Sequence, residues 1–382
     1  MSVLLTLNAG SSSLKFSVYP TGDGPALAHG QIEKIGSDDA RMEFNHGNQQ
    51  FRSNVGQLDH AGALSHILSE IETRLERSRI VAVGHRIVHG GPDFDAPQRL
   101  TPEVLDKLAE FEPLAPLHQP HNLAGVRAAI AAFPDAVQIG CFDTAFHRHH
   151  PWVNDTFALP RKYYDQGVRR YGFHGLSYDF VTGRLAEIDS HAAHGRTVIA
   201  HLGNGASMCA VLDGQSIGST MGFSALDGLP MGTRCGQLDP GVLLYLMDHE
   251  GMDSTQITNL LYKESGLLGL SGLSNDMRTL QEAGTPEAEQ AIAYYTFRIR
   301  RELGAMAAIL GGLDTLVFCG GIGEHSTRIR SEVCRGMEWL GIQLDPAANA
   351  MHLSVISTGR ATVRVIPTDE EIVIARAVRA AL

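Results

Sequence analysis

The sequence has no long apolar run of the kind that crosses a membrane. Its least polar span, residues 303–323 of 382, is interrupted by Asp314 and by the pair Gly311-Gly312. A helix, a turn and a strand explain this span better than a membrane helix does. The first residues also lack the basic region and the long apolar core of a secretory signal. We therefore expect neither membrane association nor secretion.

Cysteine and positive charge are both scarce. The five cysteines are odd in number and form no CxxC pair, so reduced thiols in a cytoplasmic protein are the simplest interpretation. Acidic residues outnumber lysine and arginine by 42 to 31, which gives a net charge of −11. A protein this acidic is not expected to bind nucleic acid or an anionic membrane through its general surface. An anionic substrate would need local positive charge where it binds.

Two common site motifs are also missing. No GxxxxGK[ST] segment occurs, which excludes a Walker-type phosphate loop. His147, His149 and His150 are close neighbours, but no HExxH motif and no Cys/His zinc spacing accompanies them. We therefore expect a solvated polar turn before Pro151, and no zinc site.

The composition that remains is typical of a globular protein, with 43% apolar and 19% charged residues. A chain of this length is too long for one ordinary core, so two domains are expected. The irregular stretch at 151–165 is the expected crossing between them.

The opening residues predict a β-hairpin with a polar turn. Short apolar runs flank a turn that contains Asn8, Gly10, three serines at 11–13 and Lys15. Hydroxyl and backbone N–H groups in such a turn could bind one anion, and Lys15 would add a mobile charge. A solvated serine-rich turn explains the same residues equally well.

Hydrophobic periodicity predicts further strands and helices along the rest of the chain. The strands are expected between 28 and 51 and at 80–83, 137–142, 197–201, 208–212, 316–319 and 363–366. The helices are expected at 55–77, 101–111, 124–133, 178–188, 241–250, 253–264, 286–310 and after Pro367.

Polar residues follow several of these strands, where open α/β sheets bind their ligands. Arg86 lies in the segment 84–91 that follows one strand, and its guanidinium could bind a carboxylate or a phosphate through two hydrogen bonds. Asp143 comes directly after the strand 137–142. It is either a site residue or a helix N-cap, and the residues alone leave both interpretations open.

The second half of the chain repeats the opening pattern of strand, glycine-containing polar turn and strand. Residues 202–207, Leu-Gly-Asn-Gly-Ala-Ser, form the second turn, and the repetition predicts a duplication. Two such turns would clamp the phosphates of a nucleotide from two sides. The strand 316–319 runs into the glycine-rich segment 320–324, which suits a bound ring or phosphate. The acidic residues 369–371 suit either the start of a helix or Mg²⁺.

Taken together, these segments resemble the acetate kinase (acetokinase) family. Eight segments match in the order of the family and cover nearly the whole chain: 8–15, 84–91, 142–147, 170–175, 201–207, 231–234, 320–324 and 367–371. The resemblance implies the actin-like ATPase fold, an α/β fold of two ribonuclease-H-like domains facing across a cleft, and a homodimer. The N-terminal domain would be 1–150, completed by a C-terminal helix at about 370–382, and the second would be 151–369.

The resemblance also implies roles for particular residues. Asn8 and Glu370 would hold Mg²⁺ (with Mn²⁺ as an alternative), Lys15 would contact phosphate, and Arg86 would bind the substrate carboxylate. The family's methyl pocket corresponds to Val88, Leu117 and Phe173. Asp143 corresponds to the catalytic acid/base, and His174 and Arg234 to the stabilisers of the transition state. The residues that resemble the loops binding ATP or ADP are His201, Leu202, Gly203, Asn204, Gly205, Asp276, Met277, Arg278, Gly321, Ile322, Gly323 and Glu324.

The implied reaction is ATP plus acetate giving ADP plus acetyl phosphate, and its reverse. A carboxylic acid with a pKa of about 4.3 is already ionised at pH 7, so the nucleophile needs no general base. We therefore expect Asp143 to orient Arg86, Mg²⁺ or its waters. An ATP-driven clamp of the actin or chaperone type is a competing interpretation, but it would not need Arg86, His174 and Arg234. A sugar kinase is another, and there Asp143 would accept a proton.

Two departures from the family's pattern concern the substrate site. Ser224-Ala225 stands where family members often have Thr-Pro, so propionate or butyrate remains an alternative substrate. Cys235-Gly236-Gln237 replaces a frequent Ser-Gly-Asp, which removes one negative charge close to Arg234.

Overall fold

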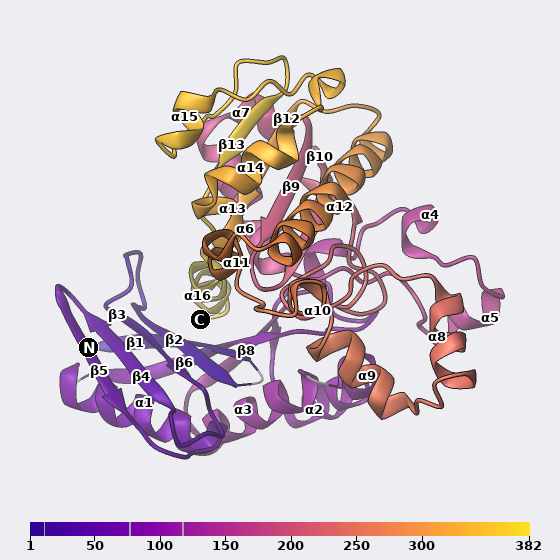
Figure 1. Ribbon diagram of the computed structural model, residues 1–382. Helices are drawn as coiled ribbons and strands as arrows, with labels where there is room; N and C mark the ends of the chain where they lie inside the picture. Colours follow the sequence, from indigo (N-terminus) through magenta and orange to yellow (C-terminus); the bar gives the residue numbers. More distant parts are fainter. Residues whose placement is uncertain (11, 76–77, 117) are drawn as a thin grey trace. The chain divides into compact units, whose positions relative to one another are not determined.

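The computed structural model describes residues 1–10, 12–75, 78–116 and 118–382 of the chain. Leu117, which the sequence analysis assigns to the methyl pocket, lies outside the described residues, as does Ser11 of the opening turn. The chain forms two compact units (Figure 1). Unit 1 is Met1–Ala145 together with Asp369–Leu382, and unit 2 is Phe146–Thr368.

Unit 1 is built on a sheet of eight strands in the order β5-β4-β3-β2-β1-β6-β8-β7. Its strands are β1 (Ser2–Ala9), β2 (Ser13–Pro20), β3 (Ala28–Glu33), β4 (Arg41–His46), β5 (Gln49–Asn54), β6 (Arg79–Ile87), β7 (Gln98–Arg99) and β8 (Val137–Phe142). The first five strands form an antiparallel meander, whereas β6 pairs in parallel with both β1 and β8. The predicted opening hairpin is confirmed, with Asn8 opposite Lys15.

Helices cover both faces of this sheet (Figure 1). On one face lie α1 (His60–Arg74), α2 (Pro102–Ala109) and α3 (Gln119–Ala132), and on the other lies α16 (Glu370–Ala380). The close approach of α16 depends on Gly84 of β6, where a Cβ atom would lie 2.4 Å from Ile374 Cγ2 and 2.6 Å from Val378 Cγ2. The end of the chain thereby becomes part of the N-terminal unit.

Unit 2 is built on a sheet of five strands in the order β11-β10-β9-β12-β13. The strands are β9 (Arg196–Leu202), β10 (Ala206–Leu212), β11 (Gln215–Ser219), β12 (Thr315–Cys319) and β13 (Thr362–Val365). The longer helices are α6 (Gly175–Ile188), α8 (Pro240–Asp248), α9 (Ser254–Lys263), α12 (Pro286–Leu310) and α14 (Thr327–Cys334). Shorter ones are α4 (Trp152–Asp155), α5 (Arg161–Asp165), α7 (Ser190–Ala193), α10 (Gly266–Ser271), α11 (Met277–Ala283), α13 (Gly320–His325) and α15 (Pro346–Ala350).

The two sheets share one topology. In unit 1 the order β3-β2-β1-β6-β8 has three antiparallel strands followed by two parallel ones, and in unit 2 the order β11-β10-β9-β12-β13 has the same directions. The predicted α/β fold with a duplicated core is therefore confirmed. No helix in the described part of the chain is long and apolar enough to cross a membrane.

Two predicted boundaries near the site are wrong. The strand expected at 80–83 continues to Ile87, because both β1 and β8 offer hydrogen-bonding partners over its whole length. Arg86 is therefore a strand residue and not a loop residue. The helix expected from residue 124 begins at Gln119, with Pro120 in its first turn.

Candidate active site

Three strand ends and one helix start meet at the same edge of the sheet in unit 1. Asn8 is the last but one residue of β1, and Arg86 holds the same position in β6. Asp143 directly follows β8, and its N–H donates to the Ile87 carbonyl at 3.0 Å, which extends the β6–β8 ladder. The side chain of Asp369 accepts from the N–H of Ile372 and caps α16, which confirms its helix-start role.

Arg86 is the centre of the resulting cluster. Its Nε donates to Asp143 Oδ1 at 2.9 Å and its Nη2 to Asp143 Oδ2 at 2.6 Å, a bidentate pair. Its Nη1 donates to Asn8 Oδ1 at 3.0 Å. The Glu370 carboxylate lies 3.7 Å from Arg86 Nε and accepts from Asn8 Nδ2 at 3.4 Å. Asp143 therefore acts here as a partner of Arg86 and not as a helix cap.

Burial makes the electrostatics of this cluster strong. Burial alone would lower the pKa of the Arg86 guanidinium, but the charges of Asp143 and Glu370 raise that pKa above its ordinary value. Burial raises the pKa of the Asp143 carboxyl, although the Arg86 charge opposes it. The side chain of Asp143 is only 2% exposed and that of Arg86 is 20% exposed. One guanidinium thus faces two carboxylates at this edge of the sheet.

The donors in this cluster fit a magnesium ion. Mg²⁺ prefers oxygen ligands and is usually held by one or two carboxylates together with substrate phosphates and water. Glu370 supplies a carboxylate, and Asn8 Oδ1 keeps one lone pair after accepting from Arg86. Among the described residues, no group of three or more histidine, cysteine or acidic side chains is arranged so that it could hold a metal ion.

Asn122 links the opening turn to the segment after β6. Its Nδ2 donates to the Ala9 carbonyl at 2.9 Å, and its Oδ1 accepts from the N–H of Val88 at 3.0 Å. Val88, a predicted pocket residue, is thereby fixed with its side chain buried. The sequence analysis assigns no role to Asn122, because the expected helix begins only at residue 124 and the structure places Asn122 in the first turn of α3.

In unit 2, His174 and Arg234 both approach Gly205. A Cβ atom on Gly205 would lie 3.1 Å from His174 Nε2 and 3.3 Å from Arg234 Nη2. Arg234 is held from behind, since its Nη1 donates to the Ala225 carbonyl at 2.8 Å. His174 adopts a left-handed backbone with φ of 58° directly before α6. The imidazole of His174 and the guanidinium of Arg234 therefore both lie close to Gly205, a residue without a side chain.

The turn from Leu202 to Gly205 lies between β9 and β10. The N–H of Gly203 donates to the Gly205 carbonyl at 3.0 Å, and Asn204 accepts from the N–H of Gly232 at 3.1 Å. A Cβ atom on Gly232 would lie 2.2 Å from Asn204 Oδ1, so only glycine fits there. His201, the partner of Ser207 across the ladder, stacks on His174 with ring centroids 4.3 Å apart.

The glycines of the predicted segment 320–324 belong to α13. Glu324 Oε1 accepts from the N–H of Gly320 at 2.8 Å and from that of Thr368 at 3.2 Å. The fully buried Arg330 holds the carbonyls of Gly323 and Glu324 at 2.8 Å each. A Cβ atom on Gly321 would have no atom within 4 Å, so this residue borders open space. Ile322 lies between Gly321 and Gly323.

The remaining predicted residues make contacts within their own units. Asp276 caps α11 through the N–H groups of Arg278 and Thr279, and its carboxylate also pairs with the exposed Arg278 side chain at 3.3 Å. Met277 is buried. Phe173 is buried in unit 2, where its carbonyl bonds to His147 Nε2 at 2.9 Å, and the exposed Lys15 side chain belongs to unit 1.

The expected solvated turn at His147 is wrong. The side chain is fully buried, with Nδ1 bonded to Ser216 Oγ at 2.8 Å. Burial lowers the pKa of His147 to about 4, so the ring is neutral. His149 alone of the three histidines is exposed. The polar residues around His147 in the sequence gave no sign that Ser216, on a strand of unit 2, would supply the hydroxyl partner.

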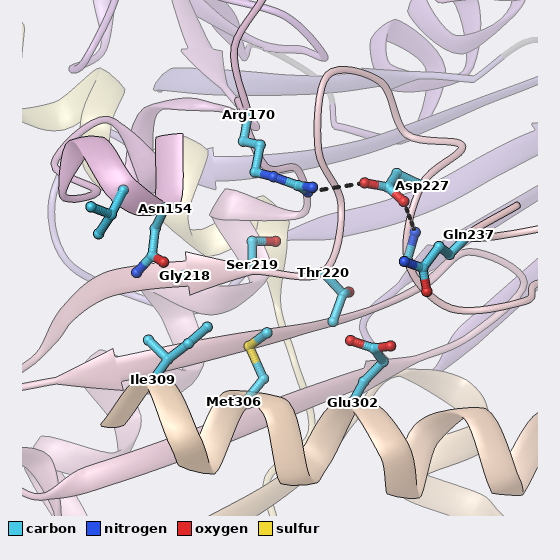
Figure 2. Close-up of a pocket in the computed structure, with 12 residues that line it drawn as sticks. Asn154, Arg170, Gly218, Ser219, Thr220, Asp227, Gln237, Glu302, Met306 and Ile309 are labelled. Carbon is cyan, nitrogen blue, oxygen red and sulfur yellow. Dashed lines mark hydrogen bonds and ion pairs between the residues drawn. The ribbon is translucent and has the colours of Figure 1, made fainter. Parts of the chain in front are cut away.

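Unit 2 also contains a polar pocket of about 200 Å³, with Arg170, Thr220 and Asp227 among its lining residues (Figure 2). None of its lining residues is a predicted site residue. Across it Arg170 Nη1 donates to Asp227 Oδ2 at 3.0 Å, and Asp227 Oδ1 accepts from the N–H of Gly228 at 2.8 Å. These bonds hold the segment that carries Ala225, the carbonyl partner of Arg234. The pocket is therefore part of the support of the site.

Comparison with known proteins adds to this geometry. The acetokinase family model matches residues 3–376. An acetate kinase of Methylocella silvestris is 54% identical, with 98% of this chain and 96% of the relative covered, and one of Rhodopseudomonas palustris is 51% identical over 98% and 97%. Among solved structures, an acetate kinase of Porphyromonas gingivalis has a TM-score of 0.90 at 40% identity, covering 100% of this chain and 99% of its own. A propionate kinase from Francisella tularensis has a TM-score of 0.93 at 35% identity, with 99% of each chain covered.

Proposed function

Because this chain belongs to the acetokinase family, we infer that it is an enzyme with acetate kinase activity and propose how its residues perform the reaction. The γ-phosphoryl group of ATP passes directly to a carboxylate oxygen of acetate, and the products are ADP and acetyl phosphate. The reaction runs in both directions. The observation that carries the proposed site is the cluster of Asn8, Arg86, Asp143 and Glu370 at one edge of a sheet.

The main obstacle in this reaction is charge repulsion. Acetate is ionised at neutral pH, and it must approach a phosphoryl group that is also anionic. Arg86 supplies a fixed positive charge at the carboxyl end of β6, where we propose that it binds the acetate carboxylate. Val88, two residues further on, and Phe173 of unit 2 are proposed to contact the methyl group. The sequence assigns Leu117 the same role.

We propose that Asp143 orients Arg86 and transfers no proton. The nucleophile is already deprotonated, so the reaction has no proton for a base to remove. The bidentate pair with Arg86 instead fixes the plane of the guanidinium, and the third nitrogen is fixed by Asn8. A guanidinium held at three points presents its remaining N–H groups in one direction.

Magnesium would be held by Glu370 and Asn8, whose oxygens fit the ion. When bound together with ATP, Mg²⁺ neutralises charge on the phosphate oxygens. Lys15 lies opposite Asn8 on the neighbouring strand, so both side chains are on the same face of the hairpin. This arrangement supports a phosphate contact for Lys15.

In unit 2 we propose that His174 and Arg234 stabilise the charge of the phosphoryl group in flight. The nucleotide is proposed to bind the backbone of 201–205 and 321–324, with Asp276, Met277 and Arg278 beside it. Open space at Gly321 and the side-chain-free Gly205 support backbone contacts to a ligand. An arginine in this role contributes about 10³–10⁵ in rate.

The acyl preference is a finer question. Ala225 takes the place of a frequent proline, and its carbonyl holds Arg234. A smaller side chain there would leave more room for a longer acid, so propionate or butyrate is the alternative substrate. Structural likeness does not separate these acids, because both an acetate kinase and a propionate kinase superimpose closely.

We propose that the protein is a homodimer and that α8 contributes to the interface. None of the residues of α8 is buried. Three of its large apolar side chains are strongly exposed: Leu244 at 61%, Tyr245 at 52% and Met247 at 53%. An apolar helix without a buried residue is typical of an interaction site. Light scattering should show that the wild type is a dimer and that the double variant Leu244→Glu with Tyr245→Glu is a monomer. A monomeric wild type would refute the proposal.

A cytoplasmic location is also proposed, supported by the five thiol side chains.

One experiment tests the reaction and its alternatives. The protein is incubated with ATP and Mg²⁺ and, in turn, acetate, propionate, butyrate and glucose, and acyl phosphate is trapped with hydroxylamine. We expect trapped acetyl phosphate in an amount equal to the ADP released. ADP release without a trapped product would indicate an ATP-driven clamp, and a phosphorylated sugar would indicate a sugar kinase. The relative kcat/KM of the three acids then gives the acyl preference.

A further inference from the structure

Two buried hydroxyl groups stand behind His174 in unit 2. Ser207 Oγ, on β10, lies 2.8 Å from His174 Nδ1. The hydroxyl of Tyr178, on α6, lies 2.5 Å from the same Ser207 Oγ. Both Ser207 and Tyr178 are fully buried. The three side chains therefore form a short line of hydrogen bonds that ends on one nitrogen of the imidazole.

The direction of these bonds follows from counting hydrogens. Burial raises the pKa of Tyr178 well above its ordinary value, so the phenol keeps its proton. A buried O–H must donate, and within the described residues the Tyr178 hydroxyl has only Ser207 Oγ as a partner. The hydroxyl of Ser207 must then donate its own hydrogen, and His174 Nδ1 is the acceptor within hydrogen-bonding distance. The line runs from Tyr178 through Ser207 to His174.

We propose that Tyr178 and Ser207 are positioning residues that hold His174 as the neutral tautomer with its proton on Nε2. An imidazole that accepts at Nδ1 carries its hydrogen on the other nitrogen. Nε2 is the atom that approaches Gly205 beside Arg234 Nη2. His174 therefore offers an N–H donor next to the arginine, directed to the same place. This inference rests on the proposed role of His174 in phosphoryl transfer.

The surroundings of His174 favour the neutral form. His201 stacks on it at 4.3 Å with an angle of 24° between the rings, and two imidazolium ions would repel each other at that distance. Arg234 adds a positive charge on the side of Nε2. His201 is itself bonded through Nδ1 to Ser177 Oγ at 2.8 Å, which in turn bonds to Thr368 Oγ1 at 2.8 Å. A neutral donor avoids placing a second positive charge beside Arg234.

The first turn of α6 provides the geometry. Tyr178 lies four residues after His174, and its N–H donates to the His174 carbonyl at 3.1 Å. His174 has a left-handed backbone, which is strained for a non-glycine residue and persists only where its surroundings fix it. The backbone bond and the hydroxyl line both return to Tyr178, so one residue fixes the backbone and the ring of His174 together.

The test is nitrogen NMR of the whole protein with ¹⁵N-labelled histidine, the His174 signals being assigned by their loss in His174→Gln. At pH 7.5, without substrates, we expect Nε2 to carry a hydrogen and Nδ1 to have none. In Tyr178→Phe the hydroxyl of Ser207 is free either to donate or to accept, so both tautomers become satisfied and we expect a mixture. A proton on Nδ1 in the wild type, or an unchanged tautomer in Tyr178→Phe, would overturn the proposal.

Tyr295→Phe is the matched control. Tyr295 is also fully buried in unit 2, on α12, and its hydroxyl has no partner within the described residues. The same atom is therefore removed without breaking a hydrogen bond, and we expect the His174 signals and the turnover to stay as in the wild type. A shift of the His174 tautomer in this variant would show that any loss of a buried phenol disturbs it, and would contradict the specific role of Tyr178.

Turnover gives the second measurement. We expect Tyr178→Phe to lower kcat about tenfold, the equivalent of one ordinary hydrogen bond, while the KM values for acetate and ATP stay nearly unchanged. Ser207→Thr keeps a hydroxyl and should restore most of the activity that Ser207→Ala loses. A kcat of wild-type size in Tyr178→Phe would contradict the positioning role. Failure of the wild type to form acetyl phosphate would refute the proposed function, and the NMR result would stand independently of it.

Discussion

The two units use one strand topology to present very different surfaces. At the carboxyl end of its parallel strands, unit 1 has charged side chains that are paired to one another, with Arg86 between Asp143 and Glu370. At the equivalent end of β9 and β12, unit 2 has glycine turns, the stacked pair of His174 and His201, and Arg234. A repeated fold therefore constrains where a site lies but leaves its chemistry to a few residues.

The largest expected effects separate the two arginines. Arg86→Ala and Arg234→Ala should each lower kcat by about 10³–10⁵. Only Arg86→Ala should also destabilise the protein, by about 3 kcal/mol, because it leaves the buried Asp143 without its partner. Steady-state kinetics and urea unfolding provide the two measurements. Equal stability of the two variants would contradict the comparison, and near-normal turnover in either would refute its assigned role.

Gly205→Ala tests whether the unit 2 site depends on a missing side chain. The new Cβ would lie 3.1 Å from His174 Nε2 and 3.3 Å from Arg234 Nη2, so both tips must shift. We expect kcat to fall about 100-fold with little loss of stability. Gly183→Ala, within α6 and with nothing within 4 Å, is the control and should stabilise the helix by about 0.5–1 kcal/mol. Activity that survives Gly205→Ala would argue against the convergence of the two tips.

Acid should weaken each unit through its own buried histidine. Burial lowers the pKa of His85 in unit 1 to about 4, and that of His147 in unit 2 to about 4. An unfolded histidine has a pKa of about 6.5, so between these values the unfolded chain binds more protons. The contribution of each neutral histidine to the free energy of unfolding is fully present above about pH 6.5. It is lost as the pH falls toward 4, by up to about 3 kcal/mol for each residue.

The measurement is urea unfolding at pH 7 and at pH 5. His85→Gln and His147→Gln should each reduce the difference in unfolding free energy between the two pH values. A variant whose pH dependence equals that of the wild type would show that its histidine is not the titrating group.

Gly84→Ala should have the smallest effect and should be confined to unit 1. Its Cβ would meet Ile374 and Val378 at 2.4 and 2.6 Å, so α16 must move away from β6 at a cost of about 1–3 kcal/mol. Because Glu370 begins this helix, we also expect a higher Mg²⁺ concentration at half-maximal activity. Gly140 of β8, which packs against Leu100 and Ile87, offers a control: Gly140→Ala should destabilise the unit while the Mg²⁺ dependence stays unchanged.

Sequence patterns predicted the elements best where the end signals are local. The helix Pro286–Leu310 has the predicted bounds because Thr285 caps it, Pro286 begins it and Gly311 ends it in a left-handed conformation. The strand Val137–Phe142 also has its predicted bounds. The end of β6 was missed because it is set by the neighbouring strands β1 and β8, which no local pattern reveals.

The site was predictable as a set of residues but not as a set of contacts. The family's motifs named Arg86, Asp143 and Glu370, whereas their mutual pairing depends on the register between β6 and β8 and on the position of α16. The burial of His147 and the line from Tyr178 through Ser207 to His174 were also beyond the sequence. Each depends on a hydroxyl from a strand that is distant along the chain.

The return of α16 to unit 1 has a consequence for the protein during its synthesis. Glu370 and the face of α16 that covers Gly84 are translated after all of unit 2, which takes on the order of tens of seconds. Until then the growing chain carries Arg86 and Asp143 on a sheet with one face uncovered, without the carboxylate proposed to hold magnesium. A ribosome that stalls within unit 2 therefore releases a fragment without a complete metal site, so incomplete copies are not expected to consume ATP in this reaction.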